Sequence, residues 1–328
     1  MEVSISGNGC RPTYAAAMWG EAVAVLKMTD VRLALLREKQ KKQKKQKKQE
    51  KQEKQKKKED DLEVEAMIAR EKALRVEFIV WRDFSAKVVR NHWNNELKTF
   101  ATIALGGGTS TTTQEEAMTM GDPLPPGCNL TAVRPVGEPA KVRELLGFMP
   151  WFFNGLLSSR ADSPDATFMT QWAQLWNEDG GFAAKWGLRT AERRHACYNY
   201  SWTHGDCWNG PSWPYETARI LTAAANILHA PAAAAATTRR TENDKGASSS
   251  SSSSLLNRST YVALLAQYAA QHTRSFAAND TASPVGSGHV FENIHPDTGV
   301  WNNRRLMYDA MGPNRDQGTS IRRTTTDF

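Results

Sequence analysis

Apolar residues recur with the period of a buried helix face in four separate stretches of the chain. These stretches are Tyr14–Thr29, Leu62–Leu97, Tyr215–His229 and Leu255–Thr273. A spacing of three and four residues places the apolar side chains on one side of a helix, so each stretch is predicted to be helical. Strand signals are sparse, because no hairpin dipeptide lies between runs of alternating polarity. We therefore predict an all-α fold.

The loops between these helices are long and carry most of the chemically informative residues. Val142–Trp176 has apolar and aromatic residues at helix-like spacing, interrupted at Gly147 and Pro150, and Asn177–Trp213 is loop-like. Long loops between pairs of helices are typical of an α/α toroid, in which loops at one end of a helical ring form a cleft. The periodicity predicts the helices but not the closed ring.

A charged, low-complexity segment separates the first two predicted helices. Lys39–Lys58 is built on Lys-Lys-Gln repeats, whose period of three leaves no apolar face. We interpret it as an exposed charged helix or a disordered insertion, with a nucleic-acid or membrane-surface arm as the alternative. Residues 37–61 contain 13 basic and 6 acidic residues, which account for the whole formal charge of +7. The rest of the chain is neutral, so we expect no nucleic-acid partner.

Other sequence features restrict the class of protein less strongly. No run of about 18 apolar residues predicts a membrane-spanning helix. The first residues do not resemble a signal peptide, whereas four Asn-x-Ser/Thr sequons permit secretion, so the localisation stays open. The four cysteines lack metal-type spacing, and they allow a disulfide without identifying its partners. We expect no metal and no cofactor, and nothing indicates the oligomeric state.

Tryptophan is concentrated in one part of the chain. The sequence has 11 tryptophans, and seven of them lie between Trp151 and Trp213, among Asn, Gly and Asp residues. Large aromatic side chains most often build a core. An indole ring beside amides and carboxylates also suits a sugar, which has apolar C–H faces and a rim of hydroxyls. The cluster therefore indicates either a core or a carbohydrate cleft.

One motif within this cluster is specific. Cys207–Pro214, with the sequence Cys-Trp-Asn-Gly-Pro-Ser-Trp-Pro, resembles the Trp-x-Gly-Pro-x-Trp-Pro motif of mannosylglycerate hydrolase-like glycosidases. That family is related to glycoside hydrolase family 63 and, more distantly, to trehalases. Segments in the same order along the chain resemble other parts of the family. They are Met1–Thr13, Gly147–Trp151, Asp179–Arg193, the helix after the motif and Phe291–Gly299.

The resemblance implies a six-hairpin glycosidase domain with insertions. We expect this incomplete (α/α)6 toroid to span residues 1–310, followed by an irregular tail. The helices that the family has before the first carboxylate loop and after the second are missing, which predicts a copy truncated at both ends. The expected insertions and the tail are residues 37–61, 105–139, 231–254 and 311–328.

The resemblance also implies a pair of catalytic carboxylates. The general acid of the family falls on Glu2, and the general base falls on Glu292, which lies in a Glu-x-x-x-Pro-x-Thr-Gly context. Inverting hydrolysis needs the two carboxyl groups about 6.5–9.5 Å apart, so that a water fits between the base and the sugar. Each residue has a plainer interpretation: Glu2 as a frayed terminal residue, and Glu292 as a carboxylate that caps a turn.

Further residues are expected to bind the carbohydrate substrate. In this interpretation Trp208 and Trp213 shape the subsite, Asn209 hydrogen-bonds sugar hydroxyls, and Gly210 holds the turn. Asp206 and Glu192 are substrate hydrogen-bonders or ion-pair partners. The remaining predicted substrate-binding residue is Trp151.

Two functional hypotheses follow from these observations. The first is a glycoside hydrolase that cleaves an α-linked glucoside or mannoside with inversion, and without a metal or cofactor. The second is a non-catalytic fragment or pseudoenzyme that retains a sugar-binding cleft. The sequence does not identify the sugar, the linkage or the compartment.

Overall fold

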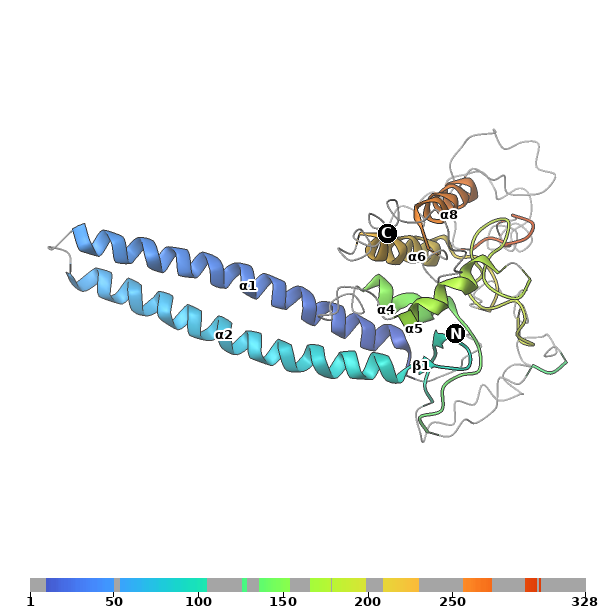
Figure 1. Ribbon diagram of the computed structural model, residues 1–328, viewed down its shortest axis with the longest axis horizontal. Coiled ribbons are helices and arrows are strands. Elements are labelled where there is room, and N and C mark those ends of the chain that lie inside the picture. The colour runs from blue at the N-terminus through green and yellow to red at the C-terminus, as the bar shows by residue number, and fades with distance from the viewer. Residues whose placement is uncertain are drawn as a thin grey trace, which may run out of the picture. The chain divides into compact units, whose positions relative to one another are not determined.

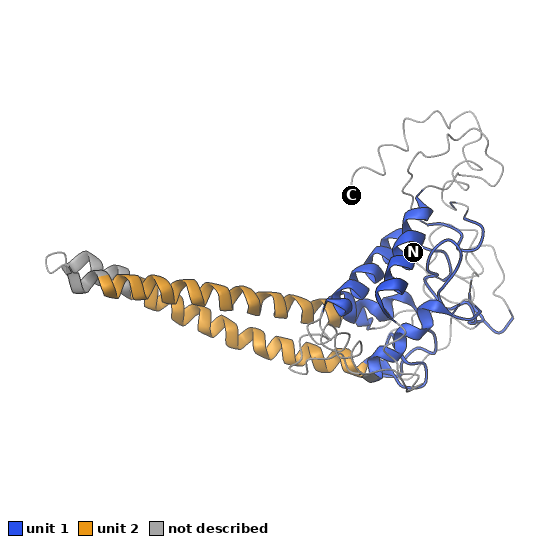
Figure 2. Cartoon of the chain, turned by 45° about the horizontal axis from the view of Figure 1, so that its top comes forward, with its two compact units in different colours: residues 1–13, 92–328 blue, residues 14–91 orange. Residues whose placement is uncertain are grey.

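The structure is a computed structural model, and it divides into two compact units. One unit comprises residues 14–91, and the other comprises residues 1–13 and 92–328 (Figure 2). We call them the hairpin unit and the loop unit. The residues that the structure describes are 10–49, 54–104, 126–128, 136–153, 166–177, 179–198, 209–229, 256–272, 293–299 and 301.

The hairpin unit consists of two long helices that run side by side in opposite directions (Figure 1). Helix α1 spans Pro12–Gln49 and helix α2 spans Lys54–Asn91. The helices predicted from residues 14 and 62 are thereby confirmed. The Lys/Gln-rich repeat continues α1 as helix through Gln49, because Lys and Gln are good helix formers even where no apolar face forms.

The two helices contact each other along a seam with coiled-coil spacing. On α1 the least exposed positions follow steps of three and four residues, as do those on α2. Such spacing keeps one stripe of each helix turned toward its neighbour. The apolar cluster of the seam contains Leu33, Leu36, Val64 and Ile68, with Met67 packed against it. The other buried seam residues include Trp19, Ala22, Leu26, Thr29, Glu71, Ser85 and Val89.

Helix α2 ends earlier than the apolar period predicts. It stops at Asn91 rather than at Leu97, and the chain turns into a two-stranded antiparallel ribbon of β1 (Trp93–Asn94) and β2 (Thr99–Phe100). The cause is local. The side chain of Asn94 accepts hydrogen bonds from the backbone N–H groups of Glu96 and Leu97, which stabilises a turn in place of another helical turn.

The described part of the loop unit contains short helices joined by irregular segments. The 3-10 helices are η1 (Leu145–Phe148) and η3 (Thr170–Trp176), and the α-helices are α4 (Met149–Phe152), α5 (Ala166–Met169), α6 (Pro214–Leu228) and α8 (Arg258–Gln271). Helix α6 packs against both α4 and α8. The all-α prediction is confirmed, and the closed toroid stays a prediction.

An aromatic cluster occupies the core of the loop unit. Trp151 and Trp172 are fully buried with ring centroids 6.2 Å apart, and Phe148 lies 5.1 Å from Trp172 and 6.0 Å from Phe182. Pairs in edge-to-face contact contribute about 0.5–1.5 kcal/mol beyond the area that they bury. Trp151 and Trp172 therefore build core, which is the plainer of the two interpretations of the tryptophan cluster.

The predicted insertions are described only in part. Of residues 105–139 the structure describes 126–128 and 136–139, and residues 231–254 and 311–328 lie outside the described residues.

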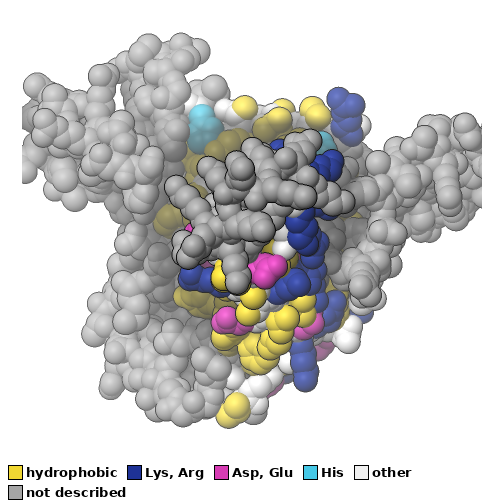
Figure 3. Space-filling model, turned by 90° about the vertical axis from the view of Figure 1, so that its left-hand side faces the viewer, with side chains coloured by type: hydrophobic (Ala, Val, Ile, Leu, Met, Phe, Trp, Pro, Cys, Tyr) yellow, Lys and Arg dark blue, Asp and Glu magenta, His cyan; other side chains and the backbone are white. Residues whose placement is uncertain are grey.

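On the face that Figure 3 presents, basic, acidic and apolar side chains are intermixed. No described helix is long and apolar enough to cross a membrane.

Candidate functional site

The loop that carries the Trp-Asn-Gly-Pro-Ser-Trp-Pro motif is held by hydrogen bonds with Thr190. The backbone N–H and the hydroxyl of Thr190 both donate to the carbonyl of Pro211, over 3.2 and 3.1 Å. The N–H of Gly210 donates in turn to the Thr190 hydroxyl over 3.1 Å. Because Thr190 is buried, these bonds lie away from water and hold the motif in a single backbone conformation.

The segment that follows Glu292 in the chain pairs with the same motif. Ser212 and Ile294 exchange two backbone hydrogen bonds of 2.9 Å, which forms a short antiparallel bridge. Ile294 is also bridged to Trp301. The residues directly after Glu292 therefore lie beside the residues that precede Trp213.

Further contacts anchor this segment from the other side. The N–H of Trp186 donates to the carbonyl of Pro296 over 2.8 Å, and Arg189 forms a 2.6 Å ion pair with Asp297. Arg189 is almost completely buried, and its guanidinium also donates to the Tyr198 hydroxyl and to the carbonyl of Ala183. Three loops that are distant in the sequence are thus joined around the motif.

Helix α8 contributes a buried amide to this junction. The Nε2 atom of Gln271 donates to the carbonyl of Trp186 over 2.6 Å and to the hydroxyl of Ser212 over 2.9 Å. Gly187 lies against this amide with φ +113°, where a Cβ would meet both Gln271 and Ser212. A glycine is required at this position, because any side chain would displace the amide that connects the two loops.

The described residues of the segment that begins at Cys10 pair with a different part of the loop unit. Cys10, which follows Glu2 in the chain, exchanges backbone hydrogen bonds of 2.8 and 2.9 Å with Ile103. Ile103 is bridged in turn to Pro139, and Cys10 Sγ lies 3.7 Å from Nε2 of His92. Burial lowers the pKa of His92, partly opposed by its hydrogen bond to a backbone carbonyl.

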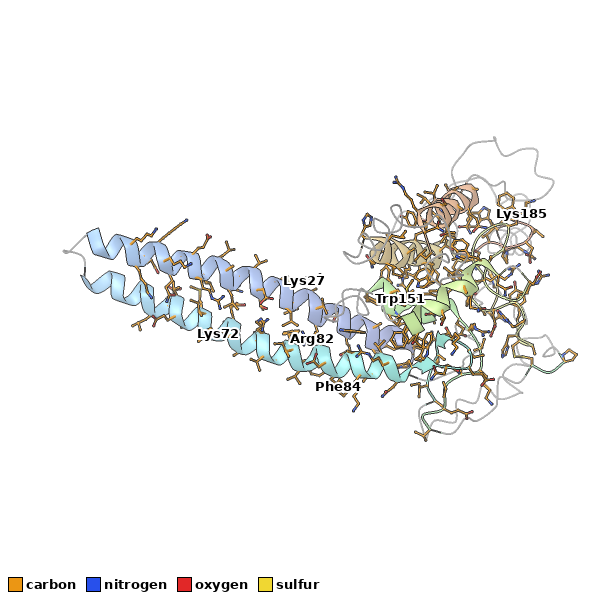
Figure 4. The ribbon with its side chains drawn as sticks, viewed as in Figure 1. Lys27, Lys72, Arg82, Phe84, Trp151 and Lys185 are labelled. Carbon is orange, nitrogen blue, oxygen red and sulfur yellow. A yellow bond between two sulfur atoms is a disulfide. The ribbon has the colours of Figure 1, made fainter. Side chains whose placement is uncertain are left out.

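Most of the predicted site residues that the structure describes are buried. Asn209 is fully buried, and its side-chain amide donates to the carbonyl of Cys197 over 3.2 Å. Trp151 is in the aromatic core, where its indole N–H donates to Gln171 (Figure 4). Gly210 is buried too, and Trp213 precedes α6 as its N-cap residue and is 7% exposed.

Glu192 is an ion-pair partner. Its Oε2 atom lies 2.7 Å from Arg143 Nη1 and 2.8 Å from Arg194 Nε, and its Oε1 atom accepts a hydrogen bond from the backbone N–H of Arg143. Both oxygens of this buried carboxylate are therefore engaged within the protein. The loops that carry Arg143 and Glu192 are also joined at the adjacent residues, where Glu144 forms an antiparallel β-bridge with Ala191.

Four predicted site residues fall outside the described residues, so their geometry is not stated. They are Glu2, Asp206, Trp208 and Glu292. Among the described residues, no cluster of three His, Cys, Asp or Glu side chains could hold a metal ion.

A carboxylate that the sequence analysis did not select follows the motif. Glu216, in the first turn of α6, is 1% exposed; its Oε1 atom lies 2.9 Å from Arg219, and its Oε2 atom has no hydrogen-bond partner among the described residues. Burial raises the pKa of Glu216 to about 7. Its place two residues after Pro214 was the available signal, but a charged residue in a first helical turn usually lies in solvent.

A disulfide anchors the loop that contacts Asn209 of the motif. Cys128 and Cys197 are bonded although 69 residues separate them in the sequence. The carbonyl of Cys197 accepts the hydrogen bond from Asn209, so the disulfide supports the loop on which this motif residue rests. Cys10 is a free cysteine.

Comparison with known proteins identifies the family of the chain. Residues 55–309 match the mannosylglycerate hydrolase MGH1-like glycoside hydrolase domain. The chain belongs to this family. No curated protein matches the chain.

A solved structure described as a sialidase has a similar fold. The TM-score is 0.53 at 19% sequence identity, and the similarity covers 94% of this chain and 21% of the sialidase chain. At this identity the similarity concerns the fold alone. The chain spans about a fifth of the length of that protein.

Proposed function

We propose that the chain acts as an inverting glycoside hydrolase on an α-linked glucoside or mannoside. Glu292 is the general base, which removes a proton from the attacking water, and Glu2 is the general acid, which protonates the leaving oxygen. The carboxyl groups stand about 6.5–9.5 Å apart in this proposal, because a water must fit between the base and the sugar.

One observation carries the proposal. The bridge between Ser212 and Ile294 joins the sugar motif to the segment that begins one residue after Glu292. A base loop and a sugar-binding loop must lie side by side for a water to reach the anomeric carbon of a bound sugar. The Arg189–Asp297 ion pair and the Trp186–Pro296 hydrogen bond support the same arrangement from a third loop.

The motif supplies the sugar-binding side of this proposal. In this proposal, Trp208 and Trp213 provide apolar ring faces for the sugar, and Asp206 and Asn209 hydrogen-bond its hydroxyl groups. The hydrogen bonds of Gly210 and Asn209 to Thr190 and Cys197 keep this loop ordered before the substrate arrives. A preorganised loop costs less free energy on binding than one that must be ordered by the ligand.

Replacing Glu292 by Gln tests the assignment of the base. The amide keeps the size of the carboxylate but cannot accept the proton, so turnover should fall by about 10²–10⁴-fold while substrate affinity changes little. Steady-state rates on a panel of α-linked disaccharides and glycosylglycerates measure this effect, and NMR of the first-formed anomer reports inversion.

Two further variants complete the experiment. Glu96→Gln changes an exposed carboxylate of the same unit and should leave turnover unchanged. Trp213→Ala should weaken sugar binding, measured by calorimetry, because it removes an aromatic surface. Near-normal turnover in Glu292→Gln would contradict the assignment. Sugar binding without any turnover in the unmodified chain would instead favour the non-catalytic alternative.

A further inference from the structure

Helix α2 carries a second stripe with coiled-coil spacing, in addition to the one that contacts α1. Its members follow one another at steps of four, three, four, three and four residues, and all of them are exposed. They are apolar without exception. The stripe consists of Leu62, Ala66, Ala69, Ala73, Val76 and Val80. We call it the outer stripe.

The outer stripe lies on the side of α2 opposite to α1. At 100° per residue, its members project about 180° from the seam residues Val64, Ile68 and Glu71, so α1 does not cover them. The inner seam contains the buried polar residues Glu71 and Ser85, whereas the outer stripe contains no polar residue. Leu62, Val76 and Val80 are each about three-fifths exposed, which is unusual for large apolar side chains in a regular repeat.

The charges that flank the outer stripe favour one particular partner. Counting Ala66 and Ala73 as positions a of the heptad, the g positions are Glu65 and Lys72, and the e positions that follow are Arg70 and Glu77; all four side chains are exposed. In a parallel pair of identical helices, position g contacts position e of the next heptad in the other helix. Glu65 then meets Arg70, and Lys72 meets Glu77, in both directions. All four contacts are attractive.

An antiparallel pair gives the opposite result. If the six outer-stripe residues of two copies are aligned in opposite directions, Arg70 lies opposite Arg70 of the other copy, and Lys72 lies opposite its own equivalent. Like charges at these positions are repulsive. The charge pattern therefore selects the parallel orientation.

Helix α1 offers an internal comparison. It also exposes apolar residues at coiled-coil spacing, including Met28, Val31 and Leu35. The residues at the corresponding g and e positions are Lys27, which is labelled in Figure 4, and Arg32. They have the same charge and would repel each other in a parallel pair. Among the described residues of these two helices, only those of α2, on which Lys72 is labelled in the same view, combine an apolar stripe with complementary charges.

We propose that the outer stripe of α2 binds the outer stripe of a second copy of this chain, as a parallel two-stranded coiled coil. The alanines allow the two backbones to approach closely at the start of the stripe, and Val76 and Val80 bury most of the apolar area at its end. The ion pairs set the register and the orientation, while the apolar burial provides most of the affinity.

The test uses sedimentation equilibrium of the full chain over a range of concentrations. The unmodified chain should form a dimer. The double variant Glu65→Arg with Lys72→Glu converts all four attractive contacts into repulsive ones, and its dissociation constant should rise by at least tenfold. The double variant Arg70→Glu with Glu77→Lys should have the same effect for the same reason.

Mixing the two double variants provides the decisive measurement. In the heterodimer all four of these g–e contacts again join opposite charges, so an equimolar mixture should regain the affinity of the unmodified chain. The control is Glu21→Lys with Lys27→Glu, which exchanges exposed charges on α1 and should still form a dimer. Circular dichroism confirms that each variant keeps its helix content.

Three outcomes would overturn the proposal. One is an unmodified chain that stays monomeric at every concentration. Another is a dimer that the two double variants leave intact, because another surface or the antiparallel orientation would then hold it. The third is failure of the mixture to regain affinity although each variant has lost it.

Discussion

The contacts that stabilise the hairpin unit internally differ in kind from those that stabilise the loop unit internally. In the hairpin, Asp30 pairs with Arg75 and Arg32 with Glu71, and contacts of the same type recur along two continuous helices. In the loop unit, the Arg189–Asp297 pair joins residues 108 positions apart, and a few hydrogen bonds at separate points connect one loop to the next. A repeated contact can be lost at one position with little effect, whereas a single connection cannot.

This difference bears on the proposed active site. A repetitive seam tolerates a longer helix, which is why the Lys/Gln repeat can extend α1 although its sequence provides no apolar face. The conformation of the Trp-Asn-Gly-Pro-Ser-Trp-Pro motif instead depends on its contacts with Thr190, with Gln271 and with the segment after Glu292. Sites held by many distant loops are sensitive to changes far from the substrate.

Removing the disulfide should produce the largest effect on the loop unit. Cys128→Ser with Cys197→Ser removes a cross-link between residues 69 positions apart in the sequence. In the chain-entropy account this corresponds to about 4 kcal/mol of lost stability. Urea unfolding followed by tryptophan fluorescence measures the loss. Cys10→Ser, which removes a free cysteine, is the matched control. If the double variant were as stable as the unmodified chain, the loop unit would not depend on this single connection.

Glu216 should make the stability of the loop unit depend on pH. Its pKa is raised by burial from 4.5 to about 7, so the folded protein retains a proton that the unfolded chain releases. Stability should therefore fall as the pH rises from about 4.5 to about 7, by up to about 3 kcal/mol, and then stay constant.

Replacing Glu216 by Gln separates this contribution from others. The variant should show no such decrease between pH 4.5 and 7, so its stability relative to the unmodified chain should be higher at pH 8 than at pH 5. Urea unfolding at both values tests this expectation, with Glu96→Gln as the exposed-carboxylate control. The same pH dependence in both the variant and the unmodified chain would show that Glu216 is not the group responsible.

A change in the hairpin should have the smallest effect. Asp30→Asn breaks a 2.7 Å ion pair with Arg75, but both side chains are about half exposed, so solvent screens the pair. Such pairs contribute about 1 kcal/mol or less. The midpoint temperature of thermal unfolding, measured by circular dichroism, should therefore fall by no more than a few degrees. A loss comparable to that of the disulfide variant would mean that the hairpin, too, depends on single contacts.

The helices of this protein were accessible from sequence because their signal is local. The apolar periods at residues 14–29, 62–91, 215–228 and 258–271 each report a buried face, and that information lies within one helix. The Trp-Asn-Gly-Pro-Ser-Trp-Pro motif was accessible for a similar reason, because seven consecutive residues carry the family resemblance. The premature end of α2 was missed because a single side chain, Asn94, competes with the helix.

Contacts between distant segments could be decided only by the tertiary structure. The pairing of Cys128 with Cys197 and the bridge between Ser212 and Ile294 have no signal in the spacing of these residues. The burial of Glu216 is a further case, since a first-turn carboxylate looks the same in sequence whether solvent or another helix faces it. Such contacts depend on where the packing of α6 against α4 and α8 brings the loops, and that position is a property of the whole chain rather than of any one segment.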